Sequence, residues 1–223
     1  MEVKHHYDLG ILGGMGPMAT VKMYERIIKK TKAKSDQDHI EMVILNKCKT
    51  PDRTNALINN GDNPLPYLNQ GIEELISLGC KYFIIPCNTA HAFKNDFVGL
   101  DKIEFLDMVS EAKKYLESHH IKAYVLCTLG TKAVKVYDSP NLEYLDANLS
   151  LKLMDIITKT KAGMNQLKEL KTLIANLNAP VLLACTELSI YYDDLRIDNK
   201  QVFDAMDIIA SKCIKKCNKE LND

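Results

Sequence analysis

Short apolar segments alternate with amphipathic segments along the chain, and this alternation restricts the possible folds more than any other feature. Continuous apolar runs at 8–14, 39–46 and 81–86 predict strands, and the segments at 17–32 and 64–78 predict helices with one apolar face. Parallel strands that are buried on both faces typically show such continuous apolar runs. The alternation therefore predicts an α/β fold whose sheets are mostly parallel and flanked by helices.

The pattern begins again near residue 121, which predicts a second α/β domain related to the first by pseudo-symmetry. We expect domains at 1–107 and 108–198, and a final helix at 199–221, capped by Asp198, that packs back on the first domain. The elements expected in the second domain are strands at 121–128, 142–146 and 179–185 and helices at 130–137, 148–161 and 164–177.

The composition argues against several classes of protein. The 223 residues are 46% hydrophobic and 26% charged, as in an ordinary globular protein. The formal net charge is zero, so nothing attracts the chain as a whole to nucleic acid or to an anionic membrane. No apolar stretch is long enough to span a bilayer, and the first residues do not resemble a signal peptide. We expect a cytoplasmic protein with no nucleic-acid and no membrane partner.

The cysteines form no recognisable disulfide or metal-binding pattern. There are seven of them, an odd number, and none belongs to a C-x-x-C pair. Zinc sites usually show closer ligand spacing with histidines nearby. We therefore expect reduced thiols and no metal site.

Two cysteines stand in matching positions. Cys87 follows the apolar run in KYFIIPCNTA, and Cys185 follows the one in APVLLACTEL. A free cysteine is most often a small buried hydrophobic residue. Here, however, polar residues follow each one, namely Asn88 and Thr89 in the first case and Thr186 in the second. Ligands bind at the carboxyl ends of strands in open α/β sheets, so the two thiols are candidates to face each other across a cleft.

A glycine-rich turn, GILGGMGPMAT, follows the first predicted strand. Gly14 and Gly16 match the dinucleotide-binding fingerprint only loosely, because the second strand ends at Asn46 and Lys47 where that fingerprint needs an acidic residue. Backbone N–H groups at the N-terminus of the following helix bind a carboxylate as readily as a phosphate, because both are anions. A carboxylate site is therefore the preferred interpretation.

The loop after the second predicted strand reads PDRT. Asp52 is a candidate cap for the next helix. Arg53 is either a solvated side chain or a planar fork that binds a substrate carboxylate, and the residues alone favour the solvated side chain.

Together, GILGGMGPMAT, PDRT, PCNTAH and CTEL resemble the motifs of the aspartate/glutamate racemase family, over nearly the whole chain. The resemblance implies two pseudo-symmetric α/β domains with the active site in the cleft between them, usually in a homodimer. It also implies that no cofactor takes part, neither pyridoxal phosphate nor a metal. Cys87 and Cys185 would be the acid/base pair, with Cys185 deprotonating the L-isomer and Cys87 the D-isomer.

The resemblance extends to the groups that bind the substrate, an acidic amino acid. Arg53 would bind one carboxylate. A lysine of the second domain, Lys161 or alternatively Lys159, would be the corresponding carboxylate ligand in that domain. Glu187 within CTEL favours aspartate racemases, because dedicated glutamate racemases usually carry histidine there. The other residues expected to line the site are Met15, Asn88, Thr89, Thr128, Thr131 and Thr186.

Three functions follow from these motifs. The first is cofactor-independent racemisation of aspartate, with glutamate open as a second substrate. The second keeps the fold and changes the chemistry, as in the related hydantoin racemases, maleate isomerases and decarboxylases that act on small acids. The third is a non-enzymatic protein that binds a small acid. Decarboxylases of this kind retain a single key cysteine, so the presence of both thiols favours racemisation.

Overall fold

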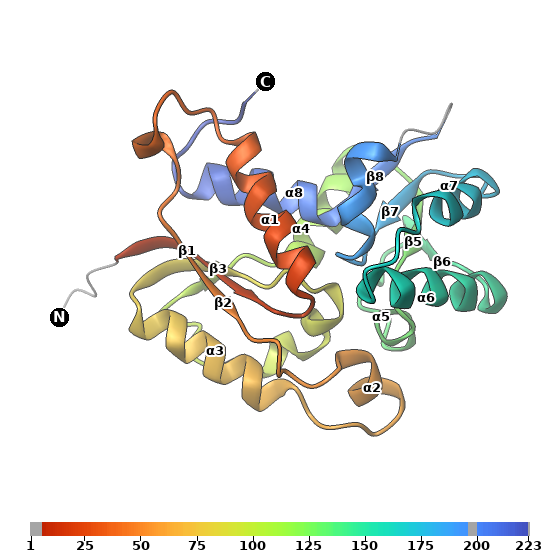
Figure 1. The fold of residues 1–223 in the computed structure, drawn as a ribbon, viewed down its shortest axis with the longest axis horizontal. Helices are drawn as coiled ribbons and strands as arrows, with labels where there is room; N and C mark the ends of the chain where they lie inside the picture. The colour runs from red at the N-terminus through yellow and green to blue at the C-terminus, as the bar shows by residue number, and fades with distance from the viewer. Residues whose placement is uncertain (1–5, 196–199, 223) are drawn as a thin grey trace.

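The apolar strands of the first half pair into a parallel sheet of order β2-β1-β3-β4 in the computed structural model, which describes residues 6–195 and 200–222 (Figure 1). Its strands are β1 (Tyr7–Gly13), β2 (Met42–Asn46), β3 (Cys80–Ile84) and β4 (Glu104–Phe105). The residues of β1 and β3 that face the helices are almost fully buried, which explains their continuous apolar sequence.

The second half repeats this arrangement. A second four-stranded parallel sheet has the order β6-β5-β7-β8, which is the same topology with each strand number raised by four. Its strands are β5 (Ala123–Leu126), β6 (Leu142–Tyr144), β7 (Val181–Leu183) and β8 (Val202–Asp204). The predicted fold of two parallel sheets flanked by helices is confirmed. The division at residues 107 and 108 falls between β4 and the next helix and stays a prediction.

Helices connect the strands of each sheet. The α-helices are α1 (Pro17–Lys30), α2 (Arg53–Ile58), α3 (Leu65–Ser77), α4 (Met108–Ser118), α5 (Leu129–Ala133), α6 (Ala147–Lys161), α7 (Leu167–Ala175) and α8 (Ala205–Lys216). Short 3₁₀ helices are η1 (Asp36–Asp38), η2 (Asn88–Asp96) and η3 (Leu188–Asp194). Within the described ranges, none of the helices has both the length and the apolar character needed to cross a bilayer.

Local chemistry explains where several helices begin and end. The side chains of Asp52, Asp107 and Asp146 each accept a hydrogen bond from a backbone N–H in the first turn of the helix that follows. Pro17 occupies the first turn of α1, where its missing N–H costs nothing. Gly163, with φ of +83°, follows the end of α6 and separates it from α7, as the sequence predicted.

One of the three apolar cores belongs to both sheets. It joins one face of β1 to α1, α4 and α8 and continues to β5 and β7 through Val125 and Leu182. The other two cores are local, one between the first sheet and α3 and one between the second sheet and α6 and α7. In Figure 1, α8 accordingly lies beside α1 and α4, away from the other helices of the second half.

The predicted bounds of the last helix, 199–221, are wrong at both ends, because α8 runs only from Ala205 to Lys216. Val202, which we expected on the apolar stripe of that helix, belongs to β8 and pairs with Val181 of β7. The helix begins only at Ala205 and is capped by the side chain of Asp204. Pairing with an existing strand outweighs the local helical pattern of a short segment that contains a β-branched and an aromatic residue. Asp198 and Asn199, the expected helix start, lie outside the described residues.

Candidate active site

Both cysteines lie just beyond the carboxyl end of a strand, one in each sheet. Cys87 follows β3 and immediately precedes η2, and Cys185 follows β7 and precedes η3 by two residues. Both are buried, with 6% and 3% of their surface exposed, and they line the same pocket. The other expected residues that line this pocket are Met15, Arg53, Asn88, Thr89, Thr128, Lys161, Thr186 and Glu187.

Thr131 is the one expected residue that lies behind the pocket wall instead of lining it. Its hydroxyl is 2.9 Å from that of Thr89 and 3.1 Å from that of Thr128, and the hydroxyls of Thr89 and Thr128 are also 2.9 Å apart. Because Thr89 follows the first sheet and the other two threonines follow β5, this cluster connects the two halves beside Cys87.

Arg53 is buried, with 7% of its surface exposed, so the solvated side chain that the residues alone favoured is wrong. Its Nη1 donates to the carbonyls of Thr50 and Pro51, and its Nη2 donates to the carbonyl of Met15. Among the residues that the structure describes, none accepts a hydrogen bond from the buried Nε–H. Nε and Nη2 therefore offer adjacent donors along one edge of the guanidinium, which is the geometry that binds a carboxylate through two hydrogen bonds.

The cation of Arg53 also stands beside Cys87. Burial works against the charge on Arg53, but the neighbouring Cys87 and Glu187 raise its pKa above the ordinary value. The guanidinium is therefore a positive charge beside the Cys87 sulfur.

Cys185 has the opposite kind of neighbour. Its Sγ donates to Oε2 of Glu187 over 3.0 Å. Burial, together with this carboxylate, raises the pKa of Cys185 well above its ordinary value, so the thiol holds its proton at neutral pH. The other oxygen of Glu187, Oε1, is buried, has no hydrogen-bond partner within residues 6–195 and 200–222, and lies 3.9 Å from Nζ of Lys161.

The structure distinguishes the two candidate lysines. Lys161 lines the pocket, where burial works against its charge but Glu187 and the two cysteines raise its pKa above the ordinary value. Lys159 lies on another face of α6 and forms a 2.6 Å ion pair with Asp155, and both of these side chains are exposed.

Sequence reasoning missed three residues of this site. Asp52 and Thr54 also line the pocket, and their position on either side of Arg53 in the PDRT motif was the available signal. Tyr137 is fully buried and donates its hydroxyl hydrogen to Oδ1 of Asn88. The buried Nδ2 of Asn88 is then a donor without a partner in the described part of the chain, and no local sequence signal marks Tyr137 for this role.

His91 supports the first cysteine from behind. Its Nδ1 lies 2.9 Å from the backbone oxygen of Cys87, and its Nε2 lies 3.6 Å from a carboxylate oxygen of Asp107. Burial lowers the pKa of His91, so the ring is neutral at neutral pH. The ring therefore fixes the backbone turn that carries Cys87 and does not itself line the pocket.

The pocket is small and opens toward a larger hollow. Its volume of about 10 Å³ is room for roughly one water molecule. A neighbouring hollow of about 400 Å³ shares Met15, Arg53, Lys161 and Glu187 with it and is also walled by the glycine-rich turn. The hollow therefore borders the pocket on the side of the glycine-rich turn.

Comparisons with known proteins agree on one family. The model of the Asp/Glu/hydantoin racemase family matches residues 12–213. The structure of Picrophilus torridus aspartate racemase is 31% identical and superposes with a TM-score of 0.83 over 96% of both chains. Glutamate racemase from Francisella tularensis in complex with D-glutamate is similar in fold alone, with 14% identity and a TM-score of 0.63 over 94% of this chain and 80% of that one.

A curated relative matches a shorter part of the chain. The broad specificity amino-acid racemase RacX of Bacillus subtilis (strain 168) is 30% identical over 133 residues. That alignment covers 58% of this chain and 58% of the relative, so it spans less than two thirds of the relative's length.

Proposed function

Since the chain belongs to the Asp/Glu/hydantoin racemase family, we propose that it interconverts L- and D-aspartate through Cys87 and Cys185, without a cofactor. The observation that carries the proposal is that the two buried thiols line one pocket, each at the end of a strand from a different sheet. Inversion requires an acid and a base on opposite faces of one carbon, and two sheets that meet at a pocket can supply one from each side.

The charges in the pocket fit an acidic amino acid. Arg53 and Lys161 supply two cations for two carboxylates, and Glu187 supplies one anion near them. The free edge of Arg53 suits one carboxylate, and the unpartnered Nδ2 of Asn88 adds a neutral donor. We propose that Lys161 binds the second carboxylate. Aspartate matches this set because it carries two carboxylates and one ammonium group.

In the proposed reaction each sulfur exchanges one proton with the α-carbon. The thiolate of Cys87 removes the α-proton of the D-isomer and becomes a thiol, while the thiol of Cys185 gives its proton to the opposite face and becomes a thiolate. The L-isomer runs the same steps in reverse. The α-hydrogen is a weak acid, so the carbanion depends on Arg53, on backbone donors and on a pocket that excludes water.

The groups beside the two sulfurs differ. Arg53 stands beside Cys87, whereas burial and Glu187 keep Cys185 protonated. A protonated Cys185 is the acid that the D-isomer needs. To start with the L-isomer, Cys185 must first lose its proton, which Oε2 of Glu187 at 3.0 Å is placed to accept, and Cys87 must hold one.

The test is incubation with L-aspartate and with D-aspartate in D₂O without added cofactor, followed by proton NMR of the α-position and chiral analysis. We expect deuterium to enter with inversion in the wild type. Cys87→Ala and Cys185→Ala each lose inversion by roughly 100-fold or more, the usual contribution of a positioned acid or base. Absence of exchange with any amino acid would refute racemisation and favour a protein that binds a small acid.

A wider substrate range is the second candidate, because the curated relative RacX is described as a broad specificity amino-acid racemase. The same exchange assay with glutamate, alanine and other amino acids measures this range. Exchange confined to aspartate and glutamate would support selection by Arg53 and Lys161, and comparable exchange with neutral amino acids would argue against it.

We also propose that the protein works as a homodimer in a reducing compartment such as the cytoplasm. All seven cysteines are free thiols, which suits such a compartment. Sedimentation velocity at several protein concentrations tests the homodimer, and a monomer at micromolar concentration would contradict it.

A further inference from the structure

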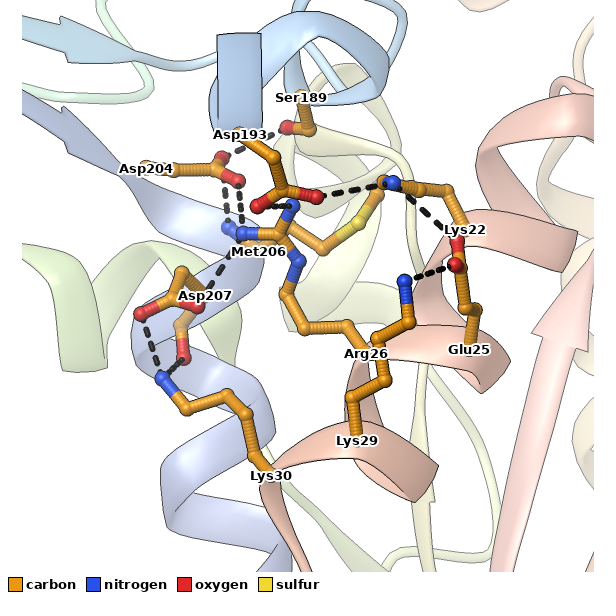
Figure 2. A network of polar contacts seen from close by, with 10 residues as sticks. All are labelled: Lys22, Glu25, Arg26, Lys29, Lys30, Ser189, Asp193, Asp204, Met206 and Asp207. Carbon is orange, nitrogen blue, oxygen red and sulfur yellow. Dashed lines mark hydrogen bonds and ion pairs between the residues drawn. The ribbon is translucent and has the colours of Figure 1, made fainter. Parts of the chain in front are cut away.

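One stripe of α1 carries three cations that face three carboxylates from the end of the chain (Figure 2). The cations are four residues apart, so they lie along one side of the helix. We call Lys22, Arg26 and Lys30 the cationic stripe; their partners are Asp193 of η3, Asp204 of β8 and Asp207 of α8.

Arg26 is the centre of this arrangement. Its Nη1 lies 3.3 Å from Asp204 and 3.1 Å from Asp207, and its Nη2 lies 3.3 Å from Asp193. The side chain of Arg26 is only 4% exposed and that of Asp204 is fully buried. The guanidinium also lies 4.9 Å from the ring centre of Tyr192 in η3. Separating such a buried pair leaves a charge without a partner. The pair of Arg26 and Asp204 therefore strongly favours one placement of α1 relative to β8.

The network continues from Asp204 toward the second cysteine motif. Oδ1 of Asp204 accepts a 2.6 Å hydrogen bond from the hydroxyl of Ser189, which is two residues beyond Glu187. Asp193, which pairs with Arg26 and Lys22, is the last residue but one of the same short helix. The ion network therefore holds η3 near its start and near its end.

The other end of α1 borders the pocket itself. The helix begins at Pro17, directly after Met15 and Gly16. A side chain on Gly16 would have its Cβ 3.2 Å from Oε1 of Glu187, so the turn before α1 and the Glu187 carboxylate are in close approach. A single helix thus touches the pocket with its N-terminus and holds the segment after Glu187 with its later turns.

We propose that Arg26, acting through Asp204 and Ser189, is a positioning residue that sets the place of Cys185 and Glu187 opposite Cys87. This inference rests on the proposed racemisation, because only a two-sided reaction requires both sulfurs to be aligned on one carbon. A misplacement of about 1 Å that arises far from the reacting atoms can reduce a rate by roughly 100-fold.

The first test follows the exposure of Cys185 and does not depend on any reaction. Wild type, Arg26→Met and the milder Ser189→Ala are treated with iodoacetamide, and the alkylation of each cysteine is followed by peptide mass spectrometry. We expect Cys185 to react about tenfold faster in both variants. Cys80, buried in the local core of the first sheet, should react at the wild-type rate. An unchanged Cys185 would overturn the proposal, as would equal acceleration of Cys80, which indicates general unfolding.

The second test separates positioning from binding by kinetics. Arg26→Met and Ser189→Ala should lower kcat for α-proton exchange by roughly 10-fold to 100-fold with little change in KM, because Arg53 and Lys161 remain in place. Arg26→Lys should recover part of the loss. The control is Lys32→Met, since Lys32 and Glu220 also connect the end of α1 to the end of the chain, over 2.8 Å, but are exposed and remote from η3.

The outcomes distinguish this inference from the proposed function. If the wild type exchanges no α-proton, the proposed function fails and the alkylation rates alone decide whether Arg26 positions Cys185. If the wild type racemises aspartate and both variants keep its kcat, the positioning inference is overturned. An equal loss of kcat in Lys32→Met would also overturn it. Such a loss would show that any contact between the end of α1 and the end of the chain affects kcat, and not the network of Arg26 in particular.

Discussion

At the scale of single residues, the main feature of the site is that its two sulfurs have unlike neighbours. Cys87 stands beside the guanidinium of Arg53, and Cys185 donates to the carboxylate of Glu187. Burial and the carboxylate keep Cys185 a neutral thiol, whereas the neighbour of Cys87 is a cation. The two sulfurs therefore have different surroundings before any substrate arrives.

Glu187→Gln tests the role of the carboxylate. Glutamine keeps the size of the side chain but cannot take a proton from Cys185, so we expect kcat from L to D to fall by roughly 10-fold to 100-fold. Removing the negative charge should also lower the pKa of Cys185, so alkylation of this cysteine should begin at a lower pH than in the wild type. Glu169→Gln, on the exposed side of α7, is the control. Unchanged L-to-D kinetics would exclude Glu187 as the proton acceptor.

Arg53→Lys tests the carboxylate fork. Lysine keeps the charge but cannot donate from two adjacent nitrogens, and it also cannot replace the bonds of Arg53 to three backbone carbonyls. We expect kcat/KM for aspartate to fall by roughly 100-fold, and the preference for aspartate over alanine to shrink. Exchange rates for both amino acids measure this. A preference equal to that of the wild type would show that the selection lies elsewhere.

At the scale of elements, the turns after the strands decide where the site residues lie. Gly14 follows β1 with φ of +91°, and a Cβ there would lie 2.5 Å from the backbone of Lys47. Gly163 has a similar φ of +83°, but its Cβ would meet nothing within 4 Å. The two glycines therefore share the backbone strain that alanine would suffer and differ only in the available space.

This pair permits a controlled stability measurement. Gly163→Ala should cost about 1–2 kcal/mol, the usual penalty for a left-handed alanine. Gly14→Ala adds a steric clash with the chain that follows β2, so we expect a loss of more than about 2 kcal/mol. Urea unfolding of both variants gives the comparison, and equal losses would mean that the turn at Gly14 adjusts without cost.

The start of α4 gives a prediction for acid stability. Burial acts to raise the pKa of Asp107, but the neighbouring His91, Lys94 and Ser110 outweigh it and lower this pKa from 3.8 to about 2. A carboxylate whose pKa is lower in the folded protein contributes stability above the unfolded pKa and loses it as pH falls toward the folded pKa. That contribution is roughly 2 kcal/mol, present above about pH 4 and lost between pH 4 and pH 2.

Asp107→Asn measures this contribution, because asparagine preserves the helix cap and removes the charge. The free energy of unfolding should decrease between pH 5 and pH 2 by roughly 2 kcal/mol less in the variant than in the wild type. Urea unfolding at both pH values provides the numbers. An identical decrease in both proteins would assign the acid sensitivity to other carboxylates.

The elements that the sequence predicted well are those with a strong local pattern. The strands β1, β2, β3, β5, β6 and β7 and the helices α1, α3, α6 and α7 follow from continuous apolar runs and from one-sided apolar stripes. The helix start at Ala205 did not, because β8 exists only through its pairing with β7. The two 3₁₀ helices after the cysteines are equally beyond local patterns, since tertiary contacts of the motif residues stabilise them.

The candidate site shows the same limit. Cys87 and Cys185 were found because the strand ends of the two sheets carry matching sequences, whereas Arg53 and Lys161 were expected from the family resemblance, and the structure brings these four residues to one pocket. The bond between Tyr137 and Asn88 and the ion network of Arg26 join residues far apart in the chain. A buried arginine or tyrosine has no local signature, because its partners lie in other elements.

At the scale of the whole molecule, the two halves are joined differently on their two sides. Toward α1, α4 and α8 they share one apolar core and the ion network of Arg26. Toward the pocket they meet through polar contacts, which include the threonine cluster and the 3.1 Å bond from Thr186 to the carbonyl of Pro86. A pocket of about 10 Å³ cannot admit an amino acid, so entry requires movement, and the polar side is the one that separates at low cost.

Hydrogen–deuterium exchange tests this division. Without ligand, amides in 127–134 and 186–190 should exchange faster than those in 205–216, and saturating aspartate should slow the first two segments and leave the third unchanged. Mass spectrometry of peptides from these segments gives the rates. Faster exchange in 205–216 than at the pocket would place the opening on the apolar side instead.

The unlike neighbours of the two sulfurs have a consequence for any reaction that connects mirror images. In water the L- and D-isomers of an amino acid have the same free energy, so their equilibrium constant is unity whatever the catalyst. The ratio kcat/KM must then be the same in the two directions, although Arg53 stands on one side and Glu187 on the other. The asymmetry of the protein can appear only as a difference in kcat that is offset by an equal difference in KM. A chiral pocket can hold one isomer longer, but it cannot make more of it.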